Sequence, residues 1–172
     1  ASGWFYGLKM IKNTWFAGAP LHPVNDSLNS AQWQLYKEGQ LLTTADKVTL
    51  AHGVLTAMGL TKKLAPVVLL VGHGSQSCNN HMQAALDCGA CCGQTGEVNV
   101  RVLAALLNDP EVRLGLSQQG LTIPELTQFV AALHNTTTDD IALVANGDAL
   151  SHEQQQWLQQ ASLQTRNERA SR

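Results

Sequence analysis

The chain has 172 residues with a formal net charge of −2, and only 14% of its residues are charged. This length suits one domain with a buried core, and the charge balance excludes a basic nucleic-acid-binding surface. The longest apolar run, Leu64–Val71, is too short to cross a bilayer, which takes about 20 residues.

Residues 1–43 form an aromatic-rich stretch, punctuated by glycine and proline, that predicts irregular structure packed onto the rest of the chain. A helix is expected from Thr44 to a stop at Gly59. Its buried stripe is predicted to contain Val48, Ala51, Leu55 and Met58. The uninterrupted apolar run Pro66–Val71 then predicts an interior strand that is buried on both faces of a parallel sheet.

The second half of the chain predicts helices and two strands. A helix at Val98–Leu107 is expected to end before Pro110, where a short helix begins and runs to Gly120. The first of these helices is predicted to bury Val98, Val102, Ala105 and Leu106. Two short strands with a Thr/Asp-rich turn follow in "TQFVAALHNTTTDDIALVAN".

A capping box of Ser151 and Gln154 begins a last predicted helix, after which the charged tail 164–172 is expected to fray. Helices that alternate with buried strands are typical of an α/β fold. We therefore expect residues 1–172 to form a single layered α/β domain with a mainly parallel sheet flanked by helices. Its core is predicted to span residues 44–163 and to contain the segment that carries reactive side chains.

That segment, "VGHGSQSCNNHMQAALDCGACCG", holds all four cysteines, which lie between Cys78 and Cys92. Such clustering is more typical of metal or thiol chemistry in a reducing, cytoplasmic compartment than of a secreted disulfide framework. His73 follows the predicted strand at the edge where α/β sheets place ligands. Cys88 comes fifteen positions later beside a glycine. Imidazole and thiolate together are typical zinc ligands, so the pair predicts a Zn²⁺ site.

Other interpretations of this segment remain open at the level of sequence. His73 can be a structural histidine among inert buried thiols, and Cys88 with Cys91 forms a CxxC pair that would suit redox chemistry. A local zinc knuckle is also possible, because His73, Cys78, Cys88 and Cys91 provide the four ligands that a structural zinc site needs. Its spacing, however, fits no common zinc finger or ribbon.

The stretch "GHGSQSCNNHMQAALDCGACCGQTGEVNVR", with "LTIPELTQFVAALHNTTTD" behind it, closely resembles the DabA family. These proteins are the zinc-binding subunits of bacterial inorganic carbon pumps, and their sites are similar to those of β-carbonic anhydrases. The resemblance is strong over residues 45–143 and looser at "GWFYGLKM" near the start. It implies a β-carbonic-anhydrase-like fold, with His73 and Cys88 as two of the zinc ligands.

Some positions depart from the family pattern. Proline, glycine and alanine are usual where this chain has His81, Cys92 and Val100, so Cys92 and Cys78 are not expected to be ligands. Cys91 is at most a neighbour of the site. The family's other two ligands come from an upstream Cys-x-Asp-x-Arg motif, yet no cysteine precedes Cys78 here. The chain therefore resembles a stretch that begins just downstream of that motif.

The turn "HNTTTD" is a second candidate region, because it contains His134 and Asp139. Threonine and aspartate are good turn formers, which is sufficient to explain the sequence locally. The resemblance implies instead that both residues lie near the zinc and orient its ligands by hydrogen bonds.

By the same resemblance, the expected function is hydration of CO₂ to bicarbonate at a carbonic-anhydrase-like zinc site of an energy-coupled uptake pump. The expected partner is an integral membrane subunit of the DabB type, which resembles a proton channel. This places the protein peripherally on the cytoplasmic face of the inner membrane. Activity is expected only for the full-length protein with that partner. A structural zinc domain and a thiol-redox domain are the alternatives.

Overall fold

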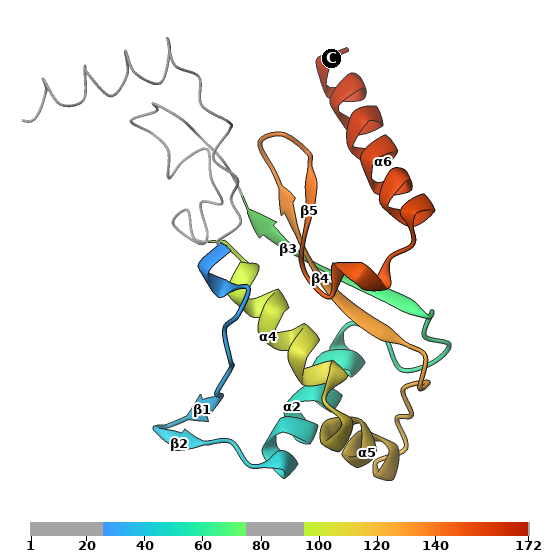
Figure 1. Ribbon diagram of the computed structural model, residues 1–172. Helices are drawn as coiled ribbons and strands as arrows, with labels where there is room; N and C mark the ends of the chain where they lie inside the picture. Colours follow the sequence, from blue (N-terminus) through green and yellow to red (C-terminus); the bar gives the residue numbers. More distant parts are fainter. Residues whose placement is uncertain (1–25, 75–94, 172) are drawn as a thin grey trace, which may run out of the picture.

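The computed structural model describes residues 26–74 and 95–171. Its helices and strands are arranged around a small sheet (Figure 1). In chain order, the elements are η1 (Asp26–Leu28), β1 (Tyr36–Lys37), β2 (Gln40–Leu41), α2 (Thr44–Ala57), β3 (Val67–Gly74), α4 (Glu97–Asn108), α5 (Pro110–Gln118), β4 (Gln128–Asn135), β5 (Ile141–Ala145), η3 (Gly147–Ala149) and α6 (His152–Ala170).

The described sheet is mixed, with strand order β3-β4-β5. β3 and β4 are parallel and pair from Val67–Gln128 through Gly74–Asn135, whereas β4 and β5 are antiparallel. The two strands predicted around the Thr/Asp-rich turn are thus confirmed as β4 and β5. The α/β class is confirmed in this coarse form. A mainly parallel sheet was expected, but only one of the two strand pairs is parallel. The five-residue connection between β4 and β5 is too short for a parallel crossover, so these strands are antiparallel.

Strand β3 is present where it was predicted, but it is less buried than expected. Among the described residues it pairs with β4 alone, so it lies at an edge of the sheet. Val71 is 48% exposed, and of the run Val67–Val71 only Leu70 is buried. The expected burial on both faces is therefore not found in the part of the chain that the structure describes.

One face of the sheet carries the hydrophobic core. Alternate residues of a strand point to opposite faces, and the members of one set, which includes Leu70, Phe129 and Leu133, are buried against α4, α2 and α5. Phe129 and Leu133 are fully inaccessible to solvent. On the helix side the core is completed by Val48, Ala51, Leu55, Val100, Ala104, Leu107, Val112 and Leu116.

Helix α4 contacts the sheet through a different stripe from the predicted one. Val98 is 46% exposed and Ala105 is exposed as well, while Leu106 is buried as expected. The buried stripe instead contains Glu97, Val100, Arg101, Ala104 and Leu107. The predicted stripe contained apolar residues alone and so left out Glu97 and Arg101. Glu97 and Arg101 are buried as a pair. The face of α4 that contacts the sheet is therefore rotated about the helix axis from the predicted face.

The helix boundaries follow local capping rules closely. Thr43 and Asp46 form a capping box at the start of α2, and the predicted box of Ser151 and Gln154 begins α6. Gly59 and Gly120 follow their helices with positive φ angles of 70° and 84°, which glycine adopts without a steric penalty. The predicted helix ends are therefore confirmed. Met58, which was expected in the buried stripe, is 49% exposed.

Two segments are more regular than predicted. Within residues 1–43, β1 and β2 form a short antiparallel hairpin, whose turn residues Glu38 and Gly39 have φ angles of 52° and 80°. Positive φ at both positions suits the twist of a two-residue hairpin. The tail 164–172 was expected to fray, but α6 continues through Ala170. Its arginines form ion pairs with Asp139 and Asp140, which are distant in sequence.

Candidate functional site

The predicted ligand His73 is the penultimate residue of strand β3 and so lies at the carboxyl end of that strand. The imidazole is partly buried, and no described residue forms a hydrogen bond with its buried Nε2 atom. A buried polar atom without a partner is unfavourable by about 1–3 kcal/mol. The position and the unpaired nitrogen together fit a metal ligand, because neutral imidazole donates a lone pair to zinc.

Two glycines bring the first turn of α4 against His73. The backbone N–H of Gly96 donates a hydrogen bond of 2.7 Å to the His73 carbonyl oxygen. A Cβ atom on Gly72 would lie 2.9 Å from the Gly96 carbonyl oxygen and 3.0 Å from Cγ1 of Val100. A side chain at Gly72 would therefore force the helix away from the strand. The amino-terminal end of α4, with its partial positive charge, consequently lies beside the histidine.

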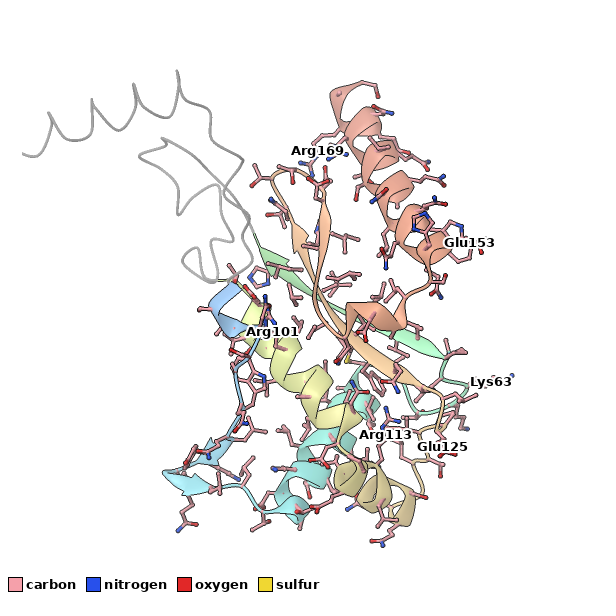
Figure 2. All side chains as sticks on the ribbon, in the orientation of Figure 1. Lys63, Arg101, Arg113, Glu125, Glu153 and Arg169 are labelled. Atoms are coloured by element: carbon pink, nitrogen blue, oxygen red, sulfur yellow. The ribbon has the colours of Figure 1, made fainter. Side chains whose placement is uncertain are left out.

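A buried ion pair between Glu97 and Arg101 stabilises the first turns of α4. Arg101 Nη2 lies 2.8 Å from Oε1 of Glu97, and both side chains are at most 3% exposed. Arg101 also donates a hydrogen bond of 2.9 Å to Oδ1 of Asn29, which links the helix to the residue after η1. Figure 2 shows Arg101 between α4 and this amino-terminal segment. The sequence analysis missed both charged residues, although their i, i+4 spacing is a recognisable signal for such a pair.

The second candidate pair, His134 and Asp139, lies at the same end of the sheet. His134 pairs in register with His73 on the neighbouring parallel strand, so both side chains project from the same face. His134 Nε2 lies 3.5 Å from Oδ1 of Asp139, whose side chain is 3% exposed. The structure thus places His134 and Asp139 beside the carboxyl end of β3, and their position near a zinc ion stays a prediction.

The turn between β4 and β5 is fixed to the end of β3 by backbone contacts. Thr136 donates two hydrogen bonds to the Gly74 carbonyl oxygen, from its backbone N–H at 2.7 Å and from its hydroxyl at 3.1 Å. Asp139 donates its N–H to the Asn135 carbonyl oxygen at 2.7 Å. The role of this turn as a compact chain reversal is confirmed, and it places Asp139 near His134 at the same time.

The other predicted zinc ligand, Cys88, lies outside the described residues, as do Cys78, Cys91 and Cys92. The distance between His73 and Cys88 therefore stays a prediction. Within residues 26–74 and 95–171, no three His, Cys, Asp or Glu side chains are grouped closely enough to hold a metal ion. Of the two predicted ligands, the described part of the chain contains His73 alone.

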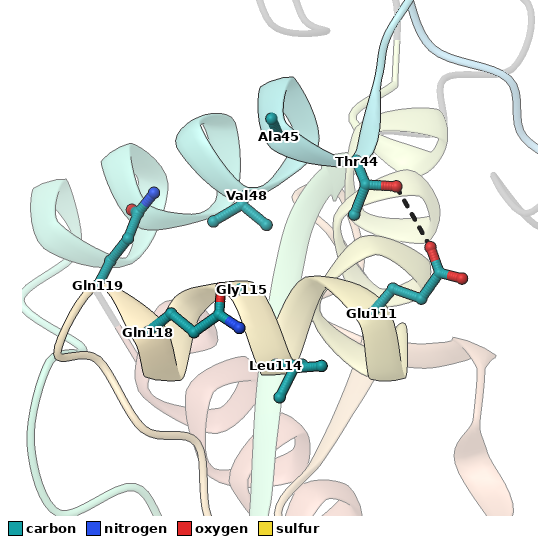
Figure 3. Close-up of a pocket in the computed structure, with 8 residues that line it drawn as sticks. All are labelled: Thr44, Ala45, Val48, Glu111, Leu114, Gly115, Gln118 and Gln119. Carbon is teal, nitrogen blue, oxygen red and sulfur yellow. Dashed lines mark hydrogen bonds between the residues drawn. The ribbon is translucent and has the colours of Figure 1, made fainter.

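A cavity of about 440 Å³ lies between α2 and α5, away from His73 (Figure 3). Thr44 donates a hydrogen bond of 3.2 Å to Oε2 of Glu111 across its mouth. Figure 3 shows mostly aliphatic and amide side chains around it, with Glu111 as the one carboxylate among the lining residues. This composition offers no pair of groups for acid–base chemistry or metal binding, so the cavity is not the candidate site.

The fold and the site define an α/β segment that places the candidate ligand His73 at the carboxyl end of a parallel strand. Over residues 1–172 the sequence matches the family described as "Probable inorganic carbon transporter subunit DabA". The chain therefore belongs to the DabA family, as its motifs suggested. No solved structure matches the chain.

Three proteins that carry this family name illustrate the extent of the similarity. One from Marinomonas sp. is 47% identical over 173 residues, which cover 99% of this chain and 21% of the relative. One from Hydrogenovibrio crunogenus is also 47% identical, over 175 residues, with coverage of 100% and 21%. One from Methylovorus glucosotrophus is 70% identical over 95 residues, or 55% of this chain and 11% of the relative. The chain thus spans about a fifth of the length of the first two relatives.

Neither α6 nor any other helix in the described ranges is both long enough and apolar enough to cross a membrane.

Proposed function

We propose that this chain contributes His73 and Cys88 to a zinc site in a subunit for inorganic carbon uptake. Membership of the DabA family supports the role in inorganic carbon transport. The single structural observation that carries the zinc assignment is the buried Nε2 atom of His73, which has no hydrogen-bond partner among the described residues. A metal ion would satisfy this nitrogen at the end of β3.

Each residue has a separate task in this proposal. β3 would supply His73, and Cys88, from the segment that follows, would bind the same ion. Because zinc bonds to nitrogen and sulfur are about 2.0–2.3 Å long, the two ligating atoms would lie within about 4 Å of each other. The remaining two ligands would come from a Cys-x-Asp-x-Arg motif, which this chain lacks. His134 and Asp139 would orient the ligands from the neighbouring strand and turn.

When bound, zinc supplies the Lewis acidity that makes water a nucleophile at neutral pH, which the hydration of CO₂ to bicarbonate requires. The chain's own residues hold the ion and shape its surroundings. Two ligands do not bind zinc tightly, since a catalytic site uses three protein ligands plus water. The isolated 172-residue chain is therefore expected to bind zinc weakly and not to hydrate CO₂.

The proposed partner is an integral membrane subunit of the DabB type that resembles a proton channel. The relatives' names describe a transporter subunit, which supports assembly into a complex. In this arrangement the protein would lie peripherally on the cytoplasmic face of the inner membrane, and the partner would couple an ion gradient to bicarbonate formation.

Metal analysis of a full-length DabA protein that carries this chain as its corresponding segment tests the proposal. After gel filtration, the unsubstituted protein should retain one zinc ion per chain. His73→Ala and Cys88→Ser should each lose most of it, because each removes a ligand. Matched controls are His152→Ala, at an exposed helical histidine, and Cys92→Ser, at a position that is not expected to bind. Both controls should retain the metal.

Other results would redirect the assignment. Stoichiometric zinc that survives both His73→Ala and Cys88→Ser would mean that the ion is held elsewhere. If the protein contains no zinc and its thiols titrate at low pH, the thiol-redox alternative is favoured. If chelation unfolds the protein and carbon uptake in cells does not depend on the site, a structural zinc domain is favoured.

A further inference from the structure

Helix α6 is held to the rest of the molecule in an unusual way. Of its nineteen residues, Ser162 alone is buried, and Trp157 and Leu163 are 57% and 53% exposed. Apolar burial is the main force that holds helices on globular proteins. It contributes little along the second half of α6, where two arginines make the contacts instead.

The two arginines reach the same turn but bind in different environments. Arg166 Nη1 lies 2.6 Å from Oδ1 of Asp140, and both side chains of this pair are more than 40% exposed. Arg169 Nη2 lies 2.8 Å from Oδ1 of Asp139, which is 3% exposed. An exposed ion pair contributes little to stability, whereas a buried carboxylate depends strongly on its partner. Arg169 therefore matters for Asp139 more than Arg166 does for Asp140.

Asp139 connects Arg169 with the candidate site. Its Oδ1 atom accepts the hydrogen bond from Arg169 and lies 3.5 Å from Nε2 of His134. Its backbone has a φ angle of 60°, which is uncommon for a residue other than glycine, and its N–H donates to the Asn135 carbonyl oxygen. His134 in turn pairs in register with His73, and neighbouring strands are about 4.8 Å apart.

The other carboxylate oxygen of Asp139, Oδ2, is buried without a hydrogen-bond partner among the described residues. The same holds for Nε2 of His73. Both atoms lie at the carboxyl end of the sheet, where the turn is fixed to Gly74. Arg169 fixes one oxygen of Asp139 and so determines where the free oxygen points. Figure 2 shows Arg169 on α6 at the height of this turn.

We propose that Arg169 is a positioning residue for the site at His73 and that it acts through Asp139 and His134. The inference rests on the proposed function, because His73 must bind a metal for its orientation to matter. Helix α6 is then part of the framework around His73, because its Arg169 contacts Asp139. Arg166 binds the exposed carboxylate of Asp140 and serves as the comparison, because it attaches the same helix to the same turn.

The contrast between the two arginines provides the test. A full-length DabA protein that carries this chain is loaded with Co²⁺, whose visible absorption reports the geometry of its ligands. Arg169→Gln should change the spectrum and weaken metal binding by about tenfold, which is the lower range for the loss of a residue that orients a ligand. Arg166→Gln removes an ion pair from the same helix and should leave both readouts unchanged. Arg169→Lys keeps the charge near Asp139 and should restore most of the binding.

The outcomes separate this inference from the proposed function. If the unsubstituted protein binds the metal but Arg169→Gln matches Arg166→Gln in spectrum and affinity, Arg169 is only a structural attachment and the inference is wrong. If the unsubstituted protein binds no metal, the proposed function fails and the inference fails with it. Circular dichroism of both variants controls for loss of α6, which would lower the helical signal equally in each.

Discussion

The two faces of the sheet differ in how closely helices cover them. On one face, Phe129 and Leu133 are fully buried against α4 and the helices behind it. On the other face, Val130 and Ala132 are also fully buried, but β3 presents Val71, which is 48% exposed, and the second half of α6 is attached by arginine–aspartate pairs (Figure 1). Apolar burial is little affected by salt, whereas exposed charge pairs contribute little and are screened. The first face therefore holds most of the clustered core, and the second carries His73 and His134.

The largest expected effect comes from removing a side chain on the α4 face. Phe129→Ala should lower the free energy of unfolding by about 3–5 kcal/mol, because it leaves a cavity in a closely packed core. Val71→Ala, on the other face of the sheet, should cost less than about 1 kcal/mol since its side chain is half exposed. Urea unfolding of both variants measures the difference. Equal losses would show that the two faces are equally buried.

The contact of β3 with α4 predicts a smaller effect at Gly72. Gly72→Ala places a Cβ atom 2.9 Å from the Gly96 carbonyl oxygen, and such overpacking costs about 1–3 kcal/mol. Gly53→Ala is a matched control inside α2, where no atom lies within 4 Å of the added Cβ. This control should stabilise the protein by about 0.5–1 kcal/mol. Thermal unfolding that ranks the two variants in the opposite order would contradict the close approach.

Much of the local structure could be predicted from the sequence because its causes are local. The capping box at Ser151, the proline that begins α5 and the glycines that end two helices depend on residues a few positions apart. The buried face of α4 could not be predicted, since burial of Glu97 depends on its pairing with Arg101 and on the packing of both against distant residues. The helical tail depends likewise on Asp139 and Asp140.

At the candidate site too, features with local causes could be predicted from the sequence, whereas those that depend on distant residues could not. The apolar run before His73 correctly predicted a strand, and the register of β3 with β4 places His134 next to His73. The role of His73 as a ligand stays a prediction. The role of Arg169 could not be inferred, because an arginine in a charged tail resembles any solvent-exposed residue. What distinguishes it is the buried carboxylate that it contacts across thirty residues of sequence.

The capping boxes of α2 and α6 should contribute differently to the free energy of unfolding, by about 1 kcal/mol. Thr43→Ala removes the capping box of α2, which is part of the core, and should lower global stability by that amount. Ser151→Ala removes the equivalent box of α6 and should increase fraying of that helix without a comparable global loss. Hydrogen exchange of the two helices, followed with urea unfolding, distinguishes them. A global loss for Ser151→Ala would mean that α6 is part of the cooperative core.

The smallest expected effect is a pH dependence at the start of α2. Hydrogen bonds from the Thr43 side chain and backbone hold the pKa of Asp46 below its ordinary value. A carboxylate with a lowered folded pKa adds stability above its unfolded pKa and loses it as the pH falls through the folded value. Exchange of the α2 amides should therefore increase in acid below about pH 4. Asp46→Asn should remove this dependence, and an unchanged profile in the variant would exclude Asp46 as its cause.

The shared metal at His73 and Cys88 is the central claim, and X-ray absorption at the zinc edge tests it most directly. The sample is a full-length DabA protein that carries this chain. The account predicts a shell with nitrogen or oxygen at about 2.0–2.1 Å and sulfur at about 2.3 Å. The zinc that His73→Ala still retains should show a weaker nitrogen or oxygen shell, and the zinc that Cys88→Ser retains should show a weaker sulfur shell. A shell without sulfur, or one that neither substitution changes, would contradict the site.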